Sequence, residues 1–412
     1  MGKSNHRNHT PVRLVHDRSL SAYAPVMAPT RAQTRARTRA PSGPGVLDAL
    51  SLLSEVADEL VVRSVRDTHD AWADRFGGYP GRSITSAVYG GMSLGLRAAS
   101  AGLGKVAGTG VGPRLEDGPR GRFVSSAVNG LIGDRLVEER PRMAISMAVR
   151  AHGADVPLDR DGLAGTFPEA TGRVAVFLHG LCENESYWDR GRERAGTTYG
   201  EMLTDEGWTP VFLRVNTGLG LRANGVALSA LMQRLVEEWP VPVTRIALVG
   251  HSMGGLIVRA AGAVASPVET PWTDLVSDVV TLGTPHLGAP IARGIGHGSR
   301  GLGKLPETAP FGRILDWRSV GVHDLVAGLA EDVPPLPHAR YRLVAATVTA
   351  DKRHPVGHVV GDFLVRVPSA YGRDRHGQQL FPGATVLHLG RTDHFGLLNH
   401  PEVHRALREW LA

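Results

Sequence analysis

The stretch IALVGHSMGGLIVRAAG, residues 246–262, decides how the rest of the chain is interpreted. An apolar run typical of a buried strand enters Gly-His-Ser-Met-Gly at 250–254 and continues into a run typical of a helix. A serine hydroxyl that projects above a sheet needs a sharp strand–turn–helix corner, where only glycine fits beside the turn. The start of the helix offers N–H groups to a developing oxyanion. The pattern indicates a nucleophile, Ser252.

The composition is that of an ordinary globular protein. The chain has 412 residues, of which 42% are hydrophobic and 21% charged. One cysteine, Cys182, excludes an intramolecular disulfide and fits a reducing compartment. No stretch approaches the ~18 apolar residues of a spanning helix, and no signal-peptide core follows the N-terminus. We expect a cytoplasmic location, with membrane association as an open possibility.

The positive charge is concentrated at the N-terminus. Residues 1–45 hold eight cations against one carboxylate, while the whole chain has a formal net charge of +6. The high pI therefore does not indicate a nucleic-acid-binding fold, and no nucleic-acid partner is expected. We expect 1–45 to be a disordered basic tail, either a solvated leader or a weak tether to phosphate groups.

Residues 46–140 are predicted to form a helical N-terminal region. Apolar residues recur at three- and four-residue steps in 46–62 and in 121–139. Between them, 86–108 is rich in glycine and alanine, which permits close helix contacts or weakens the helix. The region is either a module for a membrane surface or oligomerisation, or a part that packs on its own domain.

From residue 141 onward, strands and helices alternate. The expected strands are 173–180, 209–216, 245–250, 278–283, 340–348 and 384–390, after two short strands around 152–155. Amphipathic helices are expected at 225–239 and 401–411. Near-continuous apolar strands alternating with helices predict a mostly parallel sheet covered on both faces. We therefore assign 141–412 to one α/β domain.

Four stretches carry a resemblance to a known family: VFLHGLCEN, LVGHSMGG, VVTLGTPHLGAP and GRTDHFGLLNHP, all within about 176–401. Together they resemble α/β-hydrolases of the lipase and esterase kind. The pair GHSMGG and GTPHLGAP is similar to bacterial lipases and to acyl-inositol esterases that act on lipid anchors. The resemblance implies the α/β-hydrolase fold, with no cofactor and no metal.

Serine chemistry needs a base within hydrogen-bond reach and an acid that orients the base. In the resembled fold the chain order is Ser, then Asp or Glu, then His. His394 precedes the terminal helix, where the family places its histidine. Asp362 matches the family's acid segment, and Asp351, nearer the end of the preceding strand, is the alternative.

The oxyanion formed in such a reaction needs two N–H donors. One is expected from Met253, the residue after the nucleophile, and by resemblance the other comes from Leu181. We expect His179 to support this loop and Cys182 to be a small buried filler. His286 in GTPHLGAP either lines the pocket or belongs to the scaffold. His400 and His404 are interpreted as surface residues and not as a metal pair.

Residues 291–335 form a long excursion between strands, and such segments are usually functional. We expect a cap or lid over an apolar cleft, either mobile or static, with its apolar cover from Phe311, Ile314, Leu315 and Trp317. The resulting hypothesis is a serine hydrolase of carboxylic esters with a small-molecule or lipid-like substrate. An acyltransferase using the same residues, and a non-catalytic module that binds a membrane or partner, are the alternatives. The sequence leaves the oligomeric state open.

Overall fold

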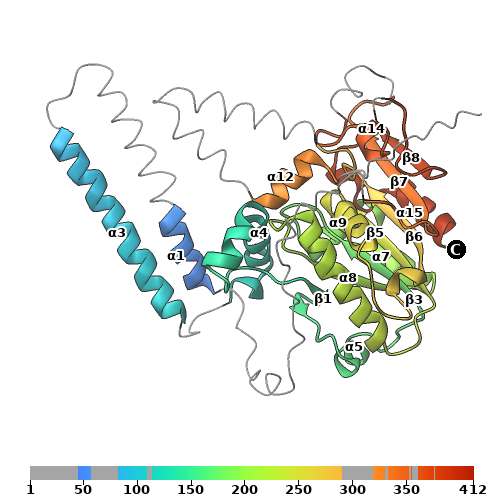
Figure 1. The fold of residues 1–412 in the computed structure, drawn as a ribbon, viewed down its shortest axis with the longest axis horizontal. Helices are drawn as coiled ribbons and strands as arrows, with labels where there is room; N and C mark the ends of the chain where they lie inside the picture. The colour runs from blue at the N-terminus through green and yellow to red at the C-terminus, as the bar shows by residue number, and fades with distance from the viewer. Residues whose placement is uncertain are drawn as a thin grey trace, which may run out of the picture. The chain divides into compact units, whose positions relative to one another are not determined.

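A computed structural model describes residues 45–56, 82–108, 114–289, 319–329, 333–351, 354, 361–374 and 376–412. Its centre is an eight-stranded sheet in the order β2-β1-β4-β3-β5-β6-β7-β8 (Figure 1). The strands are β1 Ala148–Ala151, β2 Ala154–Asp155, β3 Arg173–Leu178, β4 Thr209–Arg214, β5 Arg245–His251, β6 Val276–Leu282, β7 Arg340–Thr347 and β8 Thr385–Gly390. The six strands β3 to β8 pair in parallel, and β1 and β2 add an antiparallel edge. The mostly parallel sheet is as predicted.

The order of the central strands places a topological switch point at β3. Strand β3 pairs with β4 on one side and with β5 on the other, and Leu178 lies opposite Gly250 in the register. The chain therefore leaves β3 toward one side and later returns to the other side. In open α/β sheets, ligands bind at the carboxyl ends of the strands at such a switch point. Ser252 follows β5 there.

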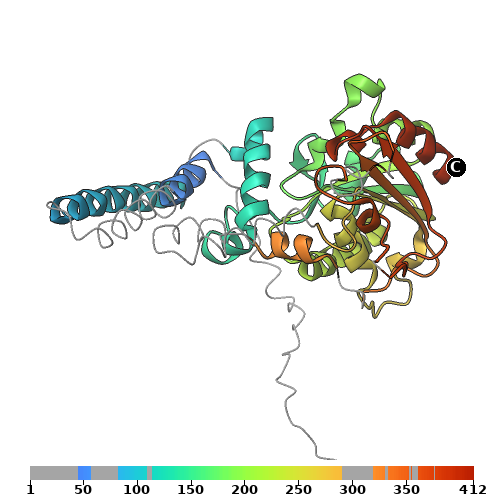
Figure 2. The ribbon, with the colours of Figure 1, turned by 90° about the horizontal axis from the view of Figure 1, so that it is seen from above.

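Helices cover both faces of the sheet. They are α5 Arg160–Thr166, α6 Arg192–Ala195, α7 Tyr199–Asp205, α8 Leu221–Glu238, α9 Met253–Gly262, α12 Val320–Ala327, α14 Val367–Ala370 and α15 Pro401–Leu411, with short 3₁₀ turns at η4 Glu185–Asp189, η5 Trp272–Leu275 and η6 Phe395–Leu397. Alternate residues of the strands divide between two cores. Val174 and Val176 pack with α8 and α9, whereas Ala175 and Phe177 pack with α7 and α15 (Figures 1 and 2). The near-continuous apolar strands therefore have two buried faces.

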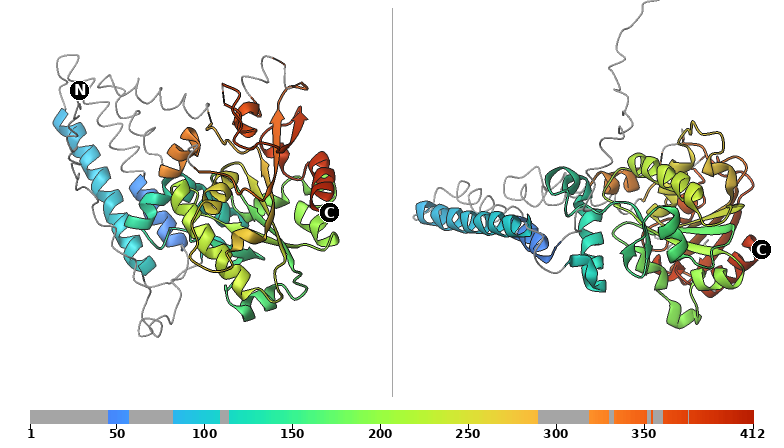
Figure 3. Two further views of the ribbon diagram at one scale, coloured as in Figure 1. Left: turned by 45° about the vertical axis from the view of Figure 1, so that its right-hand side comes forward. Right: turned by 90° about the horizontal axis from the view of Figure 1, so that it is seen from below.

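The N-terminal helices are α1 Val46–Val56, α3 Arg82–Gly108 and α4 Pro119–Glu139, with η3 Leu115–Asp117 before α4. The glycine-rich segment 86–108 lies within one helix of 27 residues, α3, which packs beside α1 (Figure 3). The Ser51 hydroxyl donates to the Ser100 carbonyl oxygen at 2.8 Å. The Arg140 guanidinium donates to the hydroxyl of Ser51 and to the hydroxyl of Ser100. Arg140, at the end of α4, thus links the two preceding helices.

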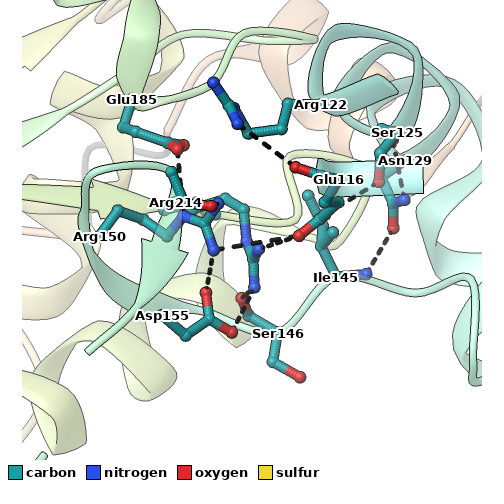
Figure 4. Close-up of polar contacts among 12 residues, drawn as sticks. Glu116, Arg122, Ser125, Asn129, Ile145, Ser146, Arg150, Asp155, Glu185 and Arg214 are labelled. Carbon is teal, nitrogen blue, oxygen red and sulfur yellow. Dashed lines mark hydrogen bonds and ion pairs between the residues drawn. The ribbon is translucent and has the colours of Figure 1, made fainter. Parts of the chain in front are cut away.

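A buried charge cluster ties η3 to the edge of the sheet. Arg150 of β1 and Arg214 of β4 lie side by side among the carboxylates of Glu116, Asp155 and Glu185 (Figure 4). Arg214 Nη1 lies 2.6 Å from Glu116 Oε2, and Arg150 Nε lies 3.1 Å from Glu185 Oε1. Buried guanidinium groups require such partners. The cluster therefore anchors the segment before α4 to the sheet.

Two predicted regions fall largely outside the described residues. Of the tail 1–45, the structure describes Gly45 alone. The apolar residues assigned to a lid at 311–317 are also outside the described part, and α12 is the described helix of that excursion. None of the described helices is both long enough and apolar enough to cross a bilayer.

Candidate active site

Ser252 lies at the corner between β5 and α9. Its backbone has φ 52° and ψ −121°, a conformation that L residues rarely adopt and that marks local strain. A Cβ at Gly250 would lie 2.6 Å from the backbone of Gly255, and one at Gly254 would lie 2.5 Å from the Leu178 carbonyl oxygen. Glycine is therefore required on both sides of the serine, which is the physical content of the Gly-x-Ser-x-Gly pattern.

His394 is held by Asp362 in a defined orientation. Its ring atom Nδ1 lies 2.7 Å from Oδ2 of Asp362, and its backbone N–H donates to the Asp362 backbone carbonyl oxygen at 3.0 Å. The other carboxylate oxygen accepts the N–H groups of Leu364 and Val365, at 3.0 and 2.7 Å. Both side chains are buried. A carboxylate facing Nδ1 places the ring proton there and leaves Nε2 as the basic nitrogen. Nε2 is buried and has no hydrogen-bond partner among the described residues.

The same ring lies beside the serine corner. Its centroid is 4.8 Å from that of His251, the residue immediately before Ser252. A Cβ at Gly283 would lie 3.1 Å from the His394 ring, and the preceding residue, Leu282, accepts the Ser252 N–H at 2.8 Å. The loops after β5, β6 and β8 therefore meet at the carboxyl edge of the sheet. The predicted nucleophile, base and acid come together in this place.

The alternative acid, Asp351, does not take part in this arrangement. It is exposed, and its carbonyl oxygen accepts from the Thr349 hydroxyl and from the His354 N–H in a turn after β7. Asp393, next to His394, accepts the Gly396 N–H at 2.6 Å and so shapes the loop. Of the two carboxylates that the sequence left open, Asp362 is the one that contacts His394.

Leu181 and Met253, the predicted oxyanion donors, follow adjacent strands. The N–H groups on either side of Leu181 are engaged: Gly180 donates to Glu183 Oε2 at 2.8 Å, and Cys182 donates to the Thr217 hydroxyl at 3.1 Å. The Leu181 N–H bonds to none of the residues that the structure describes. Met253 is the first residue of α9, so its N–H has no intrahelical acceptor. These two backbone donors lie after the adjacent strands β3 and β5.

His179 supports the loop that carries Leu181. Its Nε2 accepts the Val215 N–H at 3.0 Å, so Nδ1 carries the proton and donates to the Gly180 carbonyl oxygen at 2.9 Å. Burial lowers the pKa of His179 and keeps the ring neutral. The imidazole thus links the loop after β3 to the end of β4, as expected from the sequence.

Cys182 is a partly buried residue of the same loop. Its backbone has φ 61°, and its thiol lies 3.6 Å from the Ala127 carbonyl oxygen of α4. Burial, together with the charge of Glu183, raises the pKa of the thiol to about 11. The thiol is therefore protonated at neutral pH, and a filling role fits it better than a nucleophilic one.

Sequence reasoning missed that α4 forms part of the wall of the site. A Cβ at Gly130 would lie 2.4 Å from Cys182 Sγ, and one at Gly133 would lie 2.0 Å from the side-chain oxygen of Asn216. At these two glycines no side chain of α4 separates the helix from Cys182 and Asn216, in the loops after β3 and β4. The signal in the sequence was the pair of glycines three residues apart, which the periodicity of the helix did not explain.

Two further residues were missed, Glu183 and His251. Both are buried, and the Glu183 carboxylate lies 3.0 Å from the His251 ring. Glu183 gave one sequence signal, an acidic residue three positions after Gly180. His251 occupies the variable position before the nucleophile, where the motif itself gives no role.

Three further histidines singled out in the sequence, His286, His400 and His404, contact neighbouring parts of the fold. His286 is buried against Phe381, with ring centroids 4.6 Å apart, and burial lowers its pKa to about 3. Of its two proposed roles, scaffold is the one that fits. The interpretation of His404 as a surface residue was wrong: α15 turns it inward, and its ring lies 4.5 Å from that of Tyr199. His400 precedes α15 and accepts the Glu402 N–H.

The described part of the predicted cap is fixed to its surroundings. The Ser319 hydroxyl, before α12, donates to the Gly130 carbonyl oxygen at 2.7 Å. Asp324 of α12 accepts the Leu221 N–H at 2.8 Å, at the start of α8. Helix α12 is therefore held by α4 and α8, whereas the apolar residues expected to form the lid lie outside the described residues.

The sheet, its switch point and the serine corner define an α/β-hydrolase-like fold. Residues 226–298, which run from α8 beyond β6 and include Ser252, match the family model of the PGAP1-like alpha/beta domain. The fold assignment therefore rests on the sheet and on this matched segment.

Solved structures similar to the chain include three bacterial proteins. The mature lipase BlEst2 of Bacillus licheniformis has a TM-score of 0.42 and 20% identity, over 58% of this chain and 92% of that one. EstA of Clostridium botulinum has a TM-score of 0.38 and 14% identity, over 57% and 87%. The esterase RhEst1 of a Rhodococcus species has a TM-score of 0.36 and 15% identity, over 59% and 92%.

Proposed function

We propose that this protein is a serine hydrolase that cleaves carboxylic esters. The observation that carries the proposal is the His394 ring: Asp362 binds its Nδ1, and its Nε2 is buried without a partner among the described residues, beside the Ser252 corner. A buried basic nitrogen with no partner is costly unless a ligand or a reacting group uses it. A general base that accepts the serine proton has this environment.

The chemistry then follows from the positions of the groups. Ser252 Oγ attacks the ester carbonyl while His394 Nε2 takes its proton, and Asp362 stabilises the imidazolium that forms. The carbonyl oxygen becomes an oxyanion that the N–H groups of Leu181 and Met253 stabilise. His394 returns the proton to the leaving alcohol, and a water activated by the same ring hydrolyses the acyl-enzyme. These steps need no cofactor.

An apolar acyl part in the substrate is supported by exposed side chains beside the acid. Phe363 and Leu364, directly after Asp362, are 57% and 42% exposed. Phe363 also has φ 81°, a strained conformation that holds a large apolar side chain outward. Exposed apolar side chains next to a reactive centre favour a substrate with an acyl chain or lipid-like part.

Hydrolysis of a series of p-nitrophenyl esters, from acetate to palmitate, tests this function. We expect turnover that rises with acyl length beyond butyrate, and a loss of about 10⁶-fold in kcat for Ser252→Ala with an unchanged thermal midpoint. Adding a simple alcohol as acceptor separates the acyltransferase alternative, because a transferase converts the acyl group mainly to a new ester. Equal turnover by the wild type and Ser252→Ala would refute the proposed nucleophile.

A further inference from the structure

A buried pair of ionisable side chains lies directly beneath the serine corner and has no part in the mechanism above. Glu183, in the loop after β3, is 4% exposed, and His251, the last residue of β5, is 0% exposed. Glu183 Oε2 lies 3.0 Å from His251 Nδ1. Burial of two ionisable groups is costly unless each satisfies the other.

The contacts of His251 determine its protonation. Its Nε2 lies 3.2 Å from the carbonyl oxygen of His394, which can only accept a hydrogen bond, so Nε2 carries a proton. Its Nδ1 faces Glu183 Oε2, which also accepts the Gly180 N–H at 2.8 Å, and an ionised carboxylate can accept both bonds when Nδ1 is protonated. Nδ1 carries a proton as well. The ring is an imidazolium, and the two residues form a buried ion pair.

Electrostatics agree with this protonation. Burial opposes the charge of His251, but the attraction and hydrogen bond of Glu183 outweigh it and raise the pKa of His251. Burial likewise opposes the charge of Glu183, and the contact with His251 outweighs it and lowers the pKa of that carboxyl. The two shifts widen the pH range in which both groups are charged.

The pair contacts three of the loops that the reaction uses, those after β3, β5 and β8. Glu183 fixes the Gly180 N–H, one residue before the proposed oxyanion donor Leu181. His251 fixes the carbonyl oxygen of the proposed base, His394, and immediately precedes Ser252. A Cβ at Gly180 would lie 2.9 Å from both the Glu183 carboxylate and the Ser252 Cβ. There is therefore no room for a side chain at Gly180 between these two groups.

We propose that Glu183 and His251 form a charged positioning pair that holds the oxyanion loop and the His394 backbone in register with Ser252. The inference rests on the proposed esterase function, because it assigns roles to loops of that site. Neither residue touches the substrate in this account. They act through Gly180, through the His394 carbonyl group and through the corner itself.

The surroundings of His251 shield the pair from solvent. Besides Glu183, the charged or titratable groups that face it are the Asp362 carboxylate and the His394 ring. The rings of Trp188 and Phe395 lie 6.4 and 6.2 Å from the His251 ring. Solvent screening of the pair is therefore weak.

Kinetics of Glu183 variants test the positioning role, with kcat expressed per active site counted by fluorophosphonate titration. Glu183→Ala removes the acceptor of the Gly180 N–H and is expected to lower kcat about 10²-fold while KM for p-nitrophenyl butyrate stays the same. Both contacts fall on Oε2, so in Glu183→Gln the amide oxygen can take that place and keep the Gly180 N–H bonded without the charge, and this variant should recover most of kcat. Asp189→Asn, on an exposed carboxylate of the same segment, should match the wild type. Wild-type kcat per active site in Glu183→Ala would overturn the positioning role.

Nuclear magnetic resonance of ¹⁵N-histidine tests the pair without any turnover. The signals of His251 are assigned by their absence from the spectrum of His251→Asn. At pH 8 an ordinary histidine is neutral, but both ring nitrogens of His251 should remain protonated. In Glu183→Gln the same signals should change to those of a neutral imidazole. A neutral His251 ring in the wild type at pH 8 would overturn the ion pair. Because this measurement needs no ester turnover, it separates failure of the pair from failure of the esterase function, and it remains decisive where Glu183→Ala does not fold.

Discussion

The Nδ1 atom of His394 lies 2.7 Å from Oδ2 of Asp362, although 32 residues separate them in the chain. The second carboxylate oxygen of Asp362 is bound by two backbone N–H groups. The carboxylate therefore cannot rotate freely, and it fixes both the tautomer and the plane of the imidazole. This relationship leads directly to the first prediction.

Asp362→Asn should lower kcat for ester hydrolysis by about 10⁴-fold. The Asn amide presents an N–H to Nδ1, so the ring proton moves to Nε2, which can then no longer accept the serine proton. Asp351→Asn, the change at the rival carboxylate, should leave kcat near that of the wild type. Steady-state kinetics on p-nitrophenyl butyrate check both. Comparable losses in the two variants would contradict the assignment of the acid.

The Cys182 thiol should resist alkylation in the native protein. With its pKa raised to about 11 by burial, the thiolate fraction at pH 8 is small and increases as the pH rises toward 11. Iodoacetamide should react at least about 10²-fold more slowly with native protein at pH 8 than with protein in urea, where the pKa is ordinary. Mass spectrometry follows the modification. Equally fast reaction in the two states would show an exposed thiolate.

The packing of α4 on the oxyanion loop predicts opposite effects of two glycine substitutions. Gly130→Ala forces a methyl group against Cys182 and should lower the free energy of unfolding by about 1–3 kcal/mol. It should also reduce kcat, because the methyl displaces the loop that carries Leu181.

Gly102→Ala in α3 is the matched control, since a Cβ there meets nothing within 4 Å. Alanine favours a helix over glycine, so this change should raise the free energy of unfolding by about 0.5–1 kcal/mol without an effect on kcat. Urea unfolding measures both variants. Destabilisation by both, or by neither, would contradict the packing of α4.

The charge cluster at the sheet edge predicts a strong dependence on Glu116. Glu116→Gln leaves buried Arg214 with Asp155 as its remaining carboxylate, at 3.0 Å. The free energy of unfolding should therefore fall by somewhat less than the roughly 3–5 kcal/mol of a fully broken buried pair.

Arg192→Ala removes an exposed ion pair with Glu201, whose side chains are 58% and 43% exposed, and should cost no more than about 0.5 kcal/mol. Chemical unfolding of the two variants in parallel gives the comparison. A loss for Glu116→Gln as small as that for Arg192→Ala would show that the cluster does not anchor η3.

Local sequence signals were sufficient for the sheet and for part of the site. The apolar strands and the glycines around Ser252 reflect constraints within a few residues, so β3 to β8 and the serine corner were predictable. His394 was placed by its position before the last helix. Asp362 came from resemblance, because spacing alone left Asp351 open.

The parts that were not predicted depend on contacts between distant residues. Glu116 and Arg214 are 98 residues apart, and His251 and Glu183 are 68 apart, so no periodicity or spacing relates either pair. His404 was assigned to the surface because no carboxylate or third ligand of clear spacing supported a metal pair with His400, whereas its place on α15 buries it. Buried polar partners appear in a sequence as isolated charges, which give no sign of burial until the fold is known.

The central claim is that Ser252 is a nucleophile activated by His394. Incubation of folded protein with a fluorophosphonate probe, followed by peptide mapping, tests it most directly. The account predicts one covalent adduct, located on Ser252, that is absent from Ser252→Ala and strongly slowed in a His394→Ala variant. No adduct on Ser252 in folded wild-type protein, or labelling that is equally fast without His394, would contradict it.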